Sequence, residues 1–171
     1  MKEKFTALSM PVEEAFFLQL FREQHIFTPA AKKPPHITVC SPFKEMDNVN
    51  KQVLQELTYM FASFSQFTYT LKGTGRFSDI GVLYLSLEPS EPFQALSHAV
   101  QKKYTEIKPF ILDPILHVTL ARAKDIDSIE KEFYQKYGNQ LPIQAIGKEV
   151  CLYEKLDNIW YKRESFSLST T

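Results

Sequence analysis

The sequence predicts an α+β fold whose two similar halves place their strands around a shared cleft. Strand-like and helix-like segments alternate along the 171 residues, and the order strand, helix, strand, helix occurs once in each half. Each half also starts its second strand with a His-x-Thr segment, at His36 and at His117. This length fits one compact unit, so we expect a single domain over residues 1–171, with half-repeats of about 1–80 and 81–171 that can exchange strands.

The elements of the first half follow from hydrophobic periodicity and from the prolines. Pro11 precedes a run with helical spacing that carries Glu13 and Glu14 near its start. A proline-bearing loop at residues 28–35 then leads into a β-rich run that ends before Pro42. The predicted elements are strands at residues 5–10, 36–40 and 67–71 and helices at residues 12–24 and 50–63, the first helix with an apolar face of Val12, Ala15, Phe16, Leu20 and Phe21.

The second half repeats this order after a glycine-containing connection at residues 72–81. Strand-like and helix-like periodicities alternate again, and the C-terminal part is rich in strand-forming residues. The order of the strands within a sheet does not follow from the sequence. The predicted elements are strands at residues 82–87 and 117–121, helices at residues 92–104 and 126–137, and strand-rich segments at residues 143–153 and 159–168.

The composition favours a folded protein with a small or terminal partner. Hydrophobic residues form 44% of the chain and aromatic residues 13%, which is ample material for a core and argues against a disordered chain. Lys and Arg together number 20, as do Asp and Glu, so the formal net charge is zero. Proteins that grip long nucleic acids usually carry a basic excess, so any nucleic-acid contact should be local.

The number and spacing of the cysteines, and the N-terminal residues, indicate in which cell compartment the protein is located. Cys40 and Cys151 form no CxxC pair, and the first residues lack the basic-then-apolar profile of a signal peptide. We therefore expect a cytoplasmic protein. No apolar run approaches the ~20 residues that a membrane span requires, so we expect no membrane contact. We also expect a monomer without a protein partner.

Each His-x-Thr strand should have one polar and one apolar face, because side chains alternate between the two faces of a strand. His36 and Thr38 point one way while Ile37 and Val39 point the other, and the segment at 117–120 repeats this pattern. Such a strand buries its apolar face in its own half and presents an imidazole and a hydroxyl on the floor of a cleft.

Two imidazoles at one site suit acid–base catalysis on a phosphodiester. A histidine has an unperturbed pKa of ~6.5, so near neutral pH one histidine can accept a proton from water while the other donates one to the leaving oxygen. The hydroxyls of Thr38 and Thr119 can donate to nonbridging phosphate oxygens from both sides. Imidazoles that share a phosphate should titrate as a coupled pair. We therefore predict His36, His117, Thr38 and Thr119 as the catalytic residues, without a metal or another cofactor.

The segments Pro-His-Ile-Thr-Val at 35–39 and Leu-His-Val-Thr-Leu-Ala-Arg at 116–122 resemble the two signature motifs of the 2H (two-histidine) phosphoesterase superfamily, most closely its bacterial 2'-5' RNA ligase and cyclic phosphodiesterase branch. The resemblance covers most of the chain. It implies a bilobal fold with two pseudo-symmetric lobes of antiparallel-rich sheet, outer helices and a central cleft. It also implies metal-independent hydrolysis of 2',3'-cyclic phosphate ends of RNA or small nucleotides, with reversible 2'-5' RNA joining in some members. The same resemblance makes His117 the general base and His36 the general acid.

Further residues are candidates for contact with the substrate. Arg122 ends the second motif, but simple alternation places it on the face of Val118 and Leu120, so it reaches the cleft only if the strand ends or twists there. No basic residue follows the first motif closely. Alternation puts Cys40 on the face of His36, where we expect a small packed residue rather than a nucleophile. The aromatic candidates for stacking on a base are Phe43, Phe77, Tyr84 and Trp160, of which Trp160 is preferred because it neighbours the polar Asp157-Asn158 turn.

Several alternatives remain open. Both motif histidines could be hydrogen-bonded structural residues. A zinc site would need further ligands, and Asp113 is the only Cys, His, Asp or Glu within four residues of His117. A non-catalytic module that binds a nucleotide or an RNA end would not need two imidazoles. Within enzymes, the substrate could instead be a 2'-5'-linked oligonucleotide, a cyclic nucleotide messenger or the cyclic phosphate of an ADP-ribose product. His25 and His98 lack the motif, and we expect them at helix ends or on the surface.

Overall fold

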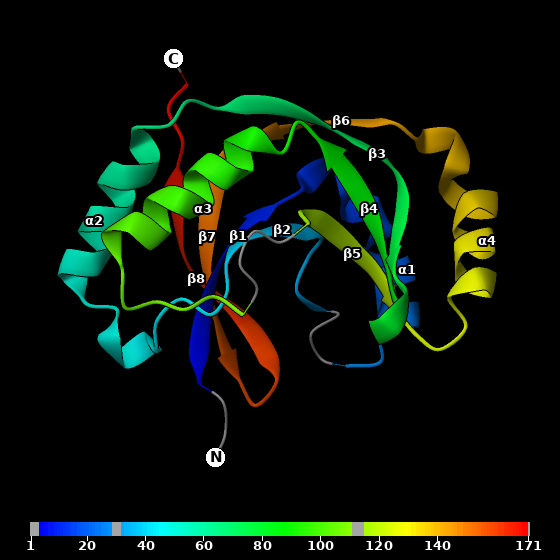
Figure 1. Cartoon of the computed structure of the whole chain (residues 1–171), viewed down its shortest axis with the longest axis horizontal. Coiled ribbons are helices and arrows are strands. Elements are labelled where there is room, and N and C mark those ends of the chain that lie inside the picture. Colours follow the sequence, from blue (N-terminus) through cyan, green and yellow to red (C-terminus); the bar gives the residue numbers. More distant parts are fainter. Residues whose placement is uncertain (1–3, 29–31, 111–114, 171) are drawn as a thin grey trace.

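Two four-stranded antiparallel sheets form the framework of the protein in this computed structural model, which describes residues 4–28, 32–110 and 115–170 (Figure 1). We call the sheet with the strand order β2-β1-β7-β8 the β2 sheet and the sheet with the order β5-β4-β3-β6 the β5 sheet. Asp113 and part of the predicted loop at 28–35 lie outside the described residues. The strands are β1 (Phe5–Pro11), β2 (His36–Cys40), β3 (Phe67–Phe77), β4 (Val82–Glu88), β5 (His117–Arg122), β6 (Ile143–Gly147), β7 (Glu149–Leu156) and β8 (Ile159–Ser167).

Helices cover the two sheets from opposite sides of the molecule. Figure 1 shows α2 (Lys51–Ala62) and α3 (Glu91–Lys103) on one side and α1 (Gln19–His25) and α4 (Ile126–Tyr137) on the other. The helix α1 connects two strands of the β2 sheet but contacts β5, and α3 connects two strands of the β5 sheet but contacts β2. The predicted α+β class with antiparallel sheets and outer helices is confirmed.

Strands are exchanged between the two halves of the chain. The strand β3 follows α2 in the first half but lies beside β4 in the β5 sheet, and β7 lies beside β1 in the β2 sheet. Each sheet therefore contains strands from before and after residue 80. Most buried apolar side chains of both sheets belong to one continuous cluster, which includes Leu8 and Met10 of β1 and Val118 and Leu120 of β5.

The first predicted helix buries only part of the apolar face that the sequence suggested: Val12, Ala15 and Phe21 are buried, and the other two residues of that face are not. It begins as a 3-10 helix, Glu13–Leu18, and continues as α1. A 3-10 helix has about 3.0 residues per turn instead of 3.6, so the faces of the two parts are rotated relative to those of a single α-helix. Phe16 and Leu20, which we expected in the core, are 42% and 63% exposed, whereas Ala15, Leu18 and Arg22 are buried.

Two predicted boundaries in the β-rich regions were wrong. The connection predicted at 72–81 is mostly strand, because β3 extends to Phe77 with a register shift between Leu71 and Thr74. A short 3-10 turn, Ser78–Ile80, and Gly81 then lead into β4. The segment predicted at 143–153 divides at Lys148 into β6 and β7, which belong to different sheets. The other predicted helices and strands are confirmed to within one or two residues, except for the added length of β7.

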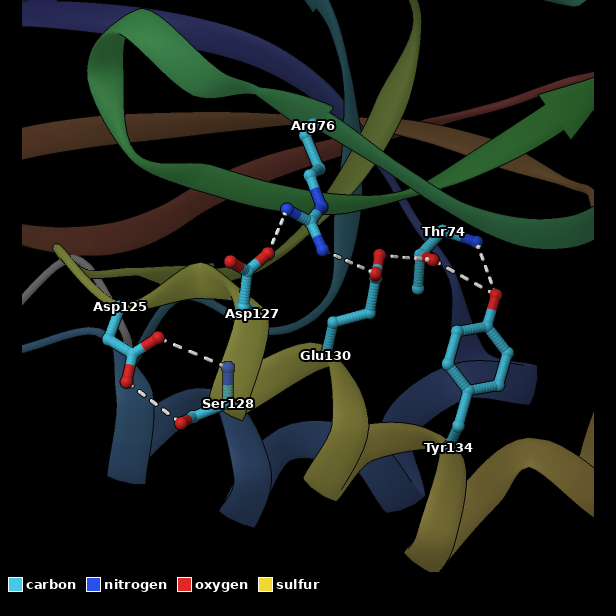
Figure 2. A network of polar contacts seen from close by, with 7 residues as sticks. All are labelled: Thr74, Arg76, Asp125, Asp127, Ser128, Glu130 and Tyr134. Atoms are coloured by element: carbon cyan, nitrogen blue, oxygen red, sulfur yellow. Dashed lines mark hydrogen bonds and ion pairs between the residues drawn. The ribbon is translucent and has the colours of Figure 1, made fainter.

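Polar contacts fasten α4 to β3 on the outside of the β5 sheet (Figure 2). Arg76 on β3 donates to the carboxylates of Asp127 and Glu130, the latter at 2.7 Å, and the Thr74 hydroxyl donates to Glu130 at 2.7 Å. The Thr74 backbone N–H donates to the Tyr134 hydroxyl at 3.1 Å. Since such exposed ion pairs contribute little free energy, their main effect is to orient α4 on the sheet that carries β5.

In the described part of the chain, no helix has both the length and the apolar character that crossing a membrane requires.

Candidate active site

The two His-x-Thr strands lie at sheet edges that approach each other. β2 is an edge strand of its sheet, β5 is an edge strand of the other, and the two strands are in contact. His36, Thr38, His117 and Thr119 all line a cavity of about 330 Å³ at this junction, a volume in the range of small-molecule sites. The remaining lining residues are Arg22, Ile26, Lys33, Val39, Cys40, Ser41, Ser97, Gln101, Pro109, Phe110, Ile115, Leu116, Arg122 and Trp160.

Both motif histidines are held in the same way, by the backbone two residues before them. The Nδ1–H of His36 donates to the carbonyl oxygen of Pro34 at 2.7 Å, and the Nδ1–H of His117 donates to that of Ile115 at 2.6 Å. A carbonyl oxygen can only accept, so Nδ1 must carry a hydrogen in both rings. Each neutral imidazole is therefore fixed with its lone pair on Nε2, which is the atom available to a ligand in the cavity.

A bulge at the same place in both strands decides which side chains follow the motifs into the cavity. In β5, Tyr84 pairs with Thr119 while Leu83 pairs with Ala121, which leaves Leu120 as the extra residue. In β2, Val39 is the extra residue in the same way. A bulge shifts the alternation by one position, so Arg122 returns to the face of His117 and Thr119 and lines the cavity. Ser41 occupies the equivalent position after the first motif.

Arg22 links the two halves of the site. Its side chain is only 2% exposed, and its Nε donates to the carbonyl oxygen of Thr119 at 2.8 Å. One terminal nitrogen donates to the side-chain oxygen of Gln19 at 2.8 Å and to the carbonyl oxygen of Lys33. The guanidinium thus joins the middle of the second motif to the loop that precedes the first.

The ring of His117 packs against two aromatic rings. The centroids of Phe77 and Tyr84 each lie 5.1 Å from that of His117, and they lie 4.5 Å from each other. Gly75, the partner of Tyr84 in the sheet, leaves room for this ring, because a Cβ on Gly75 would lie 2.4 Å from it. Phe77 and Tyr84, which the sequence suggested as platforms for a base, instead support an imidazole.

The family follows from comparison of the sequence with known proteins. Residues 10–158 match the family model described as the 2'-5' RNA ligase superfamily. The chain belongs to the 2'-5' RNA ligase superfamily. Both His-x-Thr segments lie within the matched residues, so the resemblance that these segments suggested is confirmed at the level of the family.

Curated relatives and solved structures agree with this superfamily. A Bacillus cereus (strain B4264) protein and a Bacillus cytotoxicus protein are each 25% identical to the chain, over 143 and 145 residues, which is 79% of the chain and of the relative in both cases. Both carry a provisional name as phosphoesterases. E. coli LigT, crystallised with 3'-AMP, has a TM-score of 0.64 at 16% identity, with 98% and 99% of the two chains covered. TT0787 of Thermus thermophilus has a TM-score of 0.62 at 18% identity, with 98% and 97% covered.

The surroundings lower the proton affinity of both imidazoles of this superfamily member. Burial, and then the nearby cations Lys33 and Arg22, hold the pKa of His36 well below its ordinary value. Burial lowers the pKa of His117; the hydrogen bond to Ile115 partly offsets this effect, and the charge of Arg122 adds to it. The cations Arg22, Lys33 and Arg122 line the cavity, and no carboxylate is among the described lining residues. The charge of the cavity therefore favours the binding of an anion.

The remaining predicted site residues divide between the cavity and the core. Trp160 lines the cavity, two residues after a turn in which Asp157 and Asn158 both have positive φ. Phe43 does not reach the cavity: it is buried, and its ring packs against Tyr104, 5.2 Å away. Its position directly after Pro42 made it a candidate, but it turns inward where the chain leaves the strand.

The two cysteines are free and buried. We expected Cys40 on the face of His36, but the bulge places Ser41 there instead. The Cys40 thiol donates to the carbonyl oxygen of Pro42 at 3.6 Å. Burial raises the pKa of Cys40 to about 12, so the thiol stays protonated near neutral pH and is a packing residue at the cavity wall. Among the described residues, no group of three or more His, Cys, Asp or Glu side chains could hold a metal ion.

Sequence reasoning missed several residues of the cavity. Arg22 had a signal, since it continues the buried series of Ala15 and Leu18 at helical spacing, and a charge on an apolar face points to a function. Lys33 stands three positions before His36 in the sequence Lys-Lys-Pro-Pro-His, but only the fold distinguishes it from Lys32. Phe110, which is 69% exposed at the cavity, had no signal in the sequence.

Proposed function

We propose that the chain is a phosphoesterase that hydrolyses 2',3'-cyclic phosphate ends of RNA or of small nucleotides, without a metal. The observation that carries this proposal is the matched tethering of His36 and His117, which leaves the Nε2 atom of each ring to one shared cavity. A structural histidine does not need a second one in the same arrangement at the same cavity. Acid–base catalysis on a phosphate does need two such groups, one that donates a proton and one that accepts a proton.

The reaction follows from the side chains around the cavity. Thr38, Thr119 and Arg122 hold the nonbridging oxygens of the phosphate, and one imidazole removes a proton from the attacking water. The bond from the water oxygen to phosphorus forms while the bond from phosphorus to one ribose oxygen breaks. The second imidazole donates its proton to that ribose oxygen, so a phosphomonoester and a free hydroxyl result. Joining of a cyclic phosphate to a hydroxyl, as in 2'-5' RNA ligation, is the same step with the hydroxyl oxygen attacking phosphorus in place of the water oxygen.

We propose His36 as the base and His117 as the acid, the opposite of the order that the family resemblance implies. Two cations, Lys33 and Arg22, lower the pKa of His36 in addition to its burial, whereas His117 has one, Arg122. The aromatic rings against His117 also favour a positive charge on it. His36 is therefore the ring that starts without a proton, and His117 is the ring that starts with one.

The substrate class is supported by the size and charge of the site. E. coli LigT has been crystallised with phosphate and with 3'-AMP on the same fold. The cavity of about 330 Å³ and the zero net charge favour a small or terminal substrate over a long nucleic acid. Phe110 offers a ring on which a base can stack. We further propose that the protein acts as a monomer in the cytoplasm.

The test is hydrolysis of each 2',3'-cyclic nucleotide in the presence of EDTA. We expect the wild type to release a phosphomonoester, and His36→Ala and His117→Ala each to lose about 10²- to 10⁴-fold in kcat. The control is His98→Ala, because His98 is exposed on α3 and does not line the cavity. Full activity in either motif variant, with folding intact, would contradict the mechanism. A wild type that binds but does not turn over any of these substrates would be a binding module.

A second arm of the experiment separates the two imidazoles. A nucleoside 3'-(p-nitrophenyl phosphate) has a leaving group that needs no proton. His117→Ala should therefore lose much less activity on this ester than on the cyclic substrate, while His36→Ala should lose about as much on both. The reverse pattern would return the roles to the order that the family resemblance implies.

A further inference from the structure

We propose that Lys33 binds the reacting phosphate directly, as a cation supplied from the loop before the first motif. This inference deepens the proposed function and rests on it for the identity of the anion. Lys33 belongs to neither His-x-Thr motif, and its neighbour Lys32 is exposed on the surface.

The position of the Lys33 amine places it beside the first motif. Lys33 is only 4% exposed and lines the cavity. Its Nζ donates to the hydroxyl of Ser9 at 2.8 Å, and Ser9 on β1 is the register partner of Thr38 on β2. Directly paired residues project from the same face of a sheet with Cβ atoms about 4.5–5.5 Å apart. The ammonium group therefore lies next to the threonine that is to hold the phosphate.

The contacts of Lys33 leave a requirement for an anion. None of the ion pairs among the described residues involves Lys33, and the Ser9 hydroxyl is the only hydrogen-bond acceptor found for its Nζ there. The rings of Trp160 and Tyr153 lie 4.5 Å and 4.7 Å from the amine and accommodate its charge by cation–π contact. An ammonium has three donors, so an oxygen of a ligand in the cavity can accept from those that remain.

The pseudo-symmetry of the two strands points to the same role. Arg122 follows the bulge of the second motif, and the equivalent position after the first bulge is Ser41, which has no charge. Lys33 supplies a cation to this half from the other end of the strand. A phosphate between Thr38 and Thr119 would then have one cation on each side.

Burial makes this cation costly in the absence of a ligand. Burial, and then the charge of Arg22 on α1, lower the pKa of Lys33 to about 7, with an opposing effect from Cys151 on β7. The other groups around the amine are Ser9, Tyr153 and Trp160, which are uncharged near neutral pH, and His36, whose pKa is itself low. A buried charge without a partner destabilises a fold, and an anion bound beside it offsets that cost.

The test uses sulfate, which does not titrate near neutral pH, as a probe in isothermal titration calorimetry. Lys33→Met should weaken sulfate binding at pH 6.5 by about tenfold or more, the effect expected for one lost charge-assisted hydrogen bond. Lys32→Met removes the same charge one position earlier and should bind like the wild type. Because Met replaces a buried charge with an apolar chain, Lys33→Met should also have an equal or higher Tm. Unchanged sulfate affinity in a folded Lys33→Met would overturn the inference.

A second measurement needs no variant. In wild-type protein with ¹³Cε-labelled lysine, NMR titration should show the Lys33 pKa rising above about 7 when sulfate is added, with Lys32 unchanged. A Lys33 titration that does not move while sulfate is bound overturns the inference even if Lys33→Met fails to fold. Neither readout requires turnover. Absence of cyclic-phosphate hydrolysis in the wild type would therefore refute the proposed function and leave the anion contact standing.

Discussion

His36 and His117 have similar neighbours along the chain and different neighbours in space. Both are followed by a hydrophobic residue and a threonine, and both donate to the carbonyl oxygen two residues before. Across the sheet, His36 faces the cations of the loop and of α1, whereas His117 lies on aromatic rings. Two nearly identical strands can therefore hold imidazoles with unequal proton affinities, which a donor and an acceptor require.

The pH dependence of kcat/KM follows from these proton affinities. A base works above its pKa and an acid works below its pKa, so the activity of the pair falls at both ends of a bell-shaped profile. The surroundings lower the pKa of both rings below ~6.5. We expect kcat/KM for a 2',3'-cyclic nucleotide to be greatest below about pH 6.5 and to have started to fall by that pH, because the acid loses its proton at a lowered pKa.

Removal of the Arg122 charge tests whether the fall of kcat/KM at high pH is due to His117 losing its proton. Arg122 lowers the pKa of His117, so Arg122→Gln should move the limb at which the acid loses its proton to higher pH, in addition to weakening substrate binding. Lys124→Gln, which removes an exposed charge two residues later, is the control. An alkaline limb that stays in place or moves to lower pH would show that His117 is not the acid.

At the scale of single residues, the sequence predicted the site residues that belong to the two His-x-Thr motifs. It did not predict the residues that only the fold brings into the site. His36, His117 and the two threonines follow from spacing, because alternation along one strand fixes their faces. Arg122 depended on a bulge, whose position the sequence does not reveal. Lys33 reaches the site through the pairing of β1 with β2, which no local pattern encodes.

Among the elements, β4 and β3 together support the His117 ring. Gly75 and Tyr84 are paired across the two strands, and the tyrosine ring covers the glycine. Any side chain at Gly75 would displace that ring, which contacts His117. The geometry of His117, the proposed acid, therefore depends on a glycine in a strand that carries no motif residue.

Gly75→Ala should lower kcat by about 10- to 100-fold, because a displaced Tyr84 no longer holds the imidazole in place. The matched control is Gly73→Ala on the same strand, where the nearest atom to a new Cβ is the Tyr134 hydroxyl at 3.5 Å, an ordinary contact. Steady-state kinetics on the cyclic substrate, with circular dichroism to confirm folding, would check this. Equal kcat in the two alanine variants would show that the ring does not position His117.

The elements themselves were largely predictable, and the exceptions have physical causes. The helix α2 was predicted because Val53, Leu57 and Phe61 recur at helical spacing, and Asn50 accepts the Val53 N–H at 3.0 Å as its cap. Two residues of the apolar face of the first helix were mispredicted because a 3-10 helix rotates that face, a change that depends on packing against β6. The length of β3 was underestimated because its glycines resemble a turn, although Gly75 accommodates the ring of Tyr84 instead.

For the whole molecule, the exchange of strands makes the two halves interdependent. Without β7 and β8, the β2 sheet would have only β1 and β2, and without β3 the strand β4 would lose one of its two neighbours. A two-stranded hairpin alone is marginally stable at best in water. The half-repeats seen in the sequence are therefore not expected to be units that fold.

A split of the chain in the exposed turn after Asp79 tests this interdependence. Fragments 1–79 and 80–171 should each lack cooperative thermal unfolding when alone, and an equimolar mixture refolded together should regain it along with activity. The uncut protein taken through the same refolding steps is the control. A fragment that unfolds cooperatively by itself would contradict the interdependence of the halves.

The place of β7 and β8 in the sheet also sets when the site can exist. Both strands follow His36 and His117 along the chain, and they complete the sheet whose far edge carries His36. A nascent chain that ends before Glu149 has both histidines but lacks the strand that pairs with β1 and the strand that brings Trp160 to the cavity. The two imidazoles can therefore face one cavity only after residues beyond both motifs have been synthesised, and we expect a partial chain that carries both histidines to be inactive.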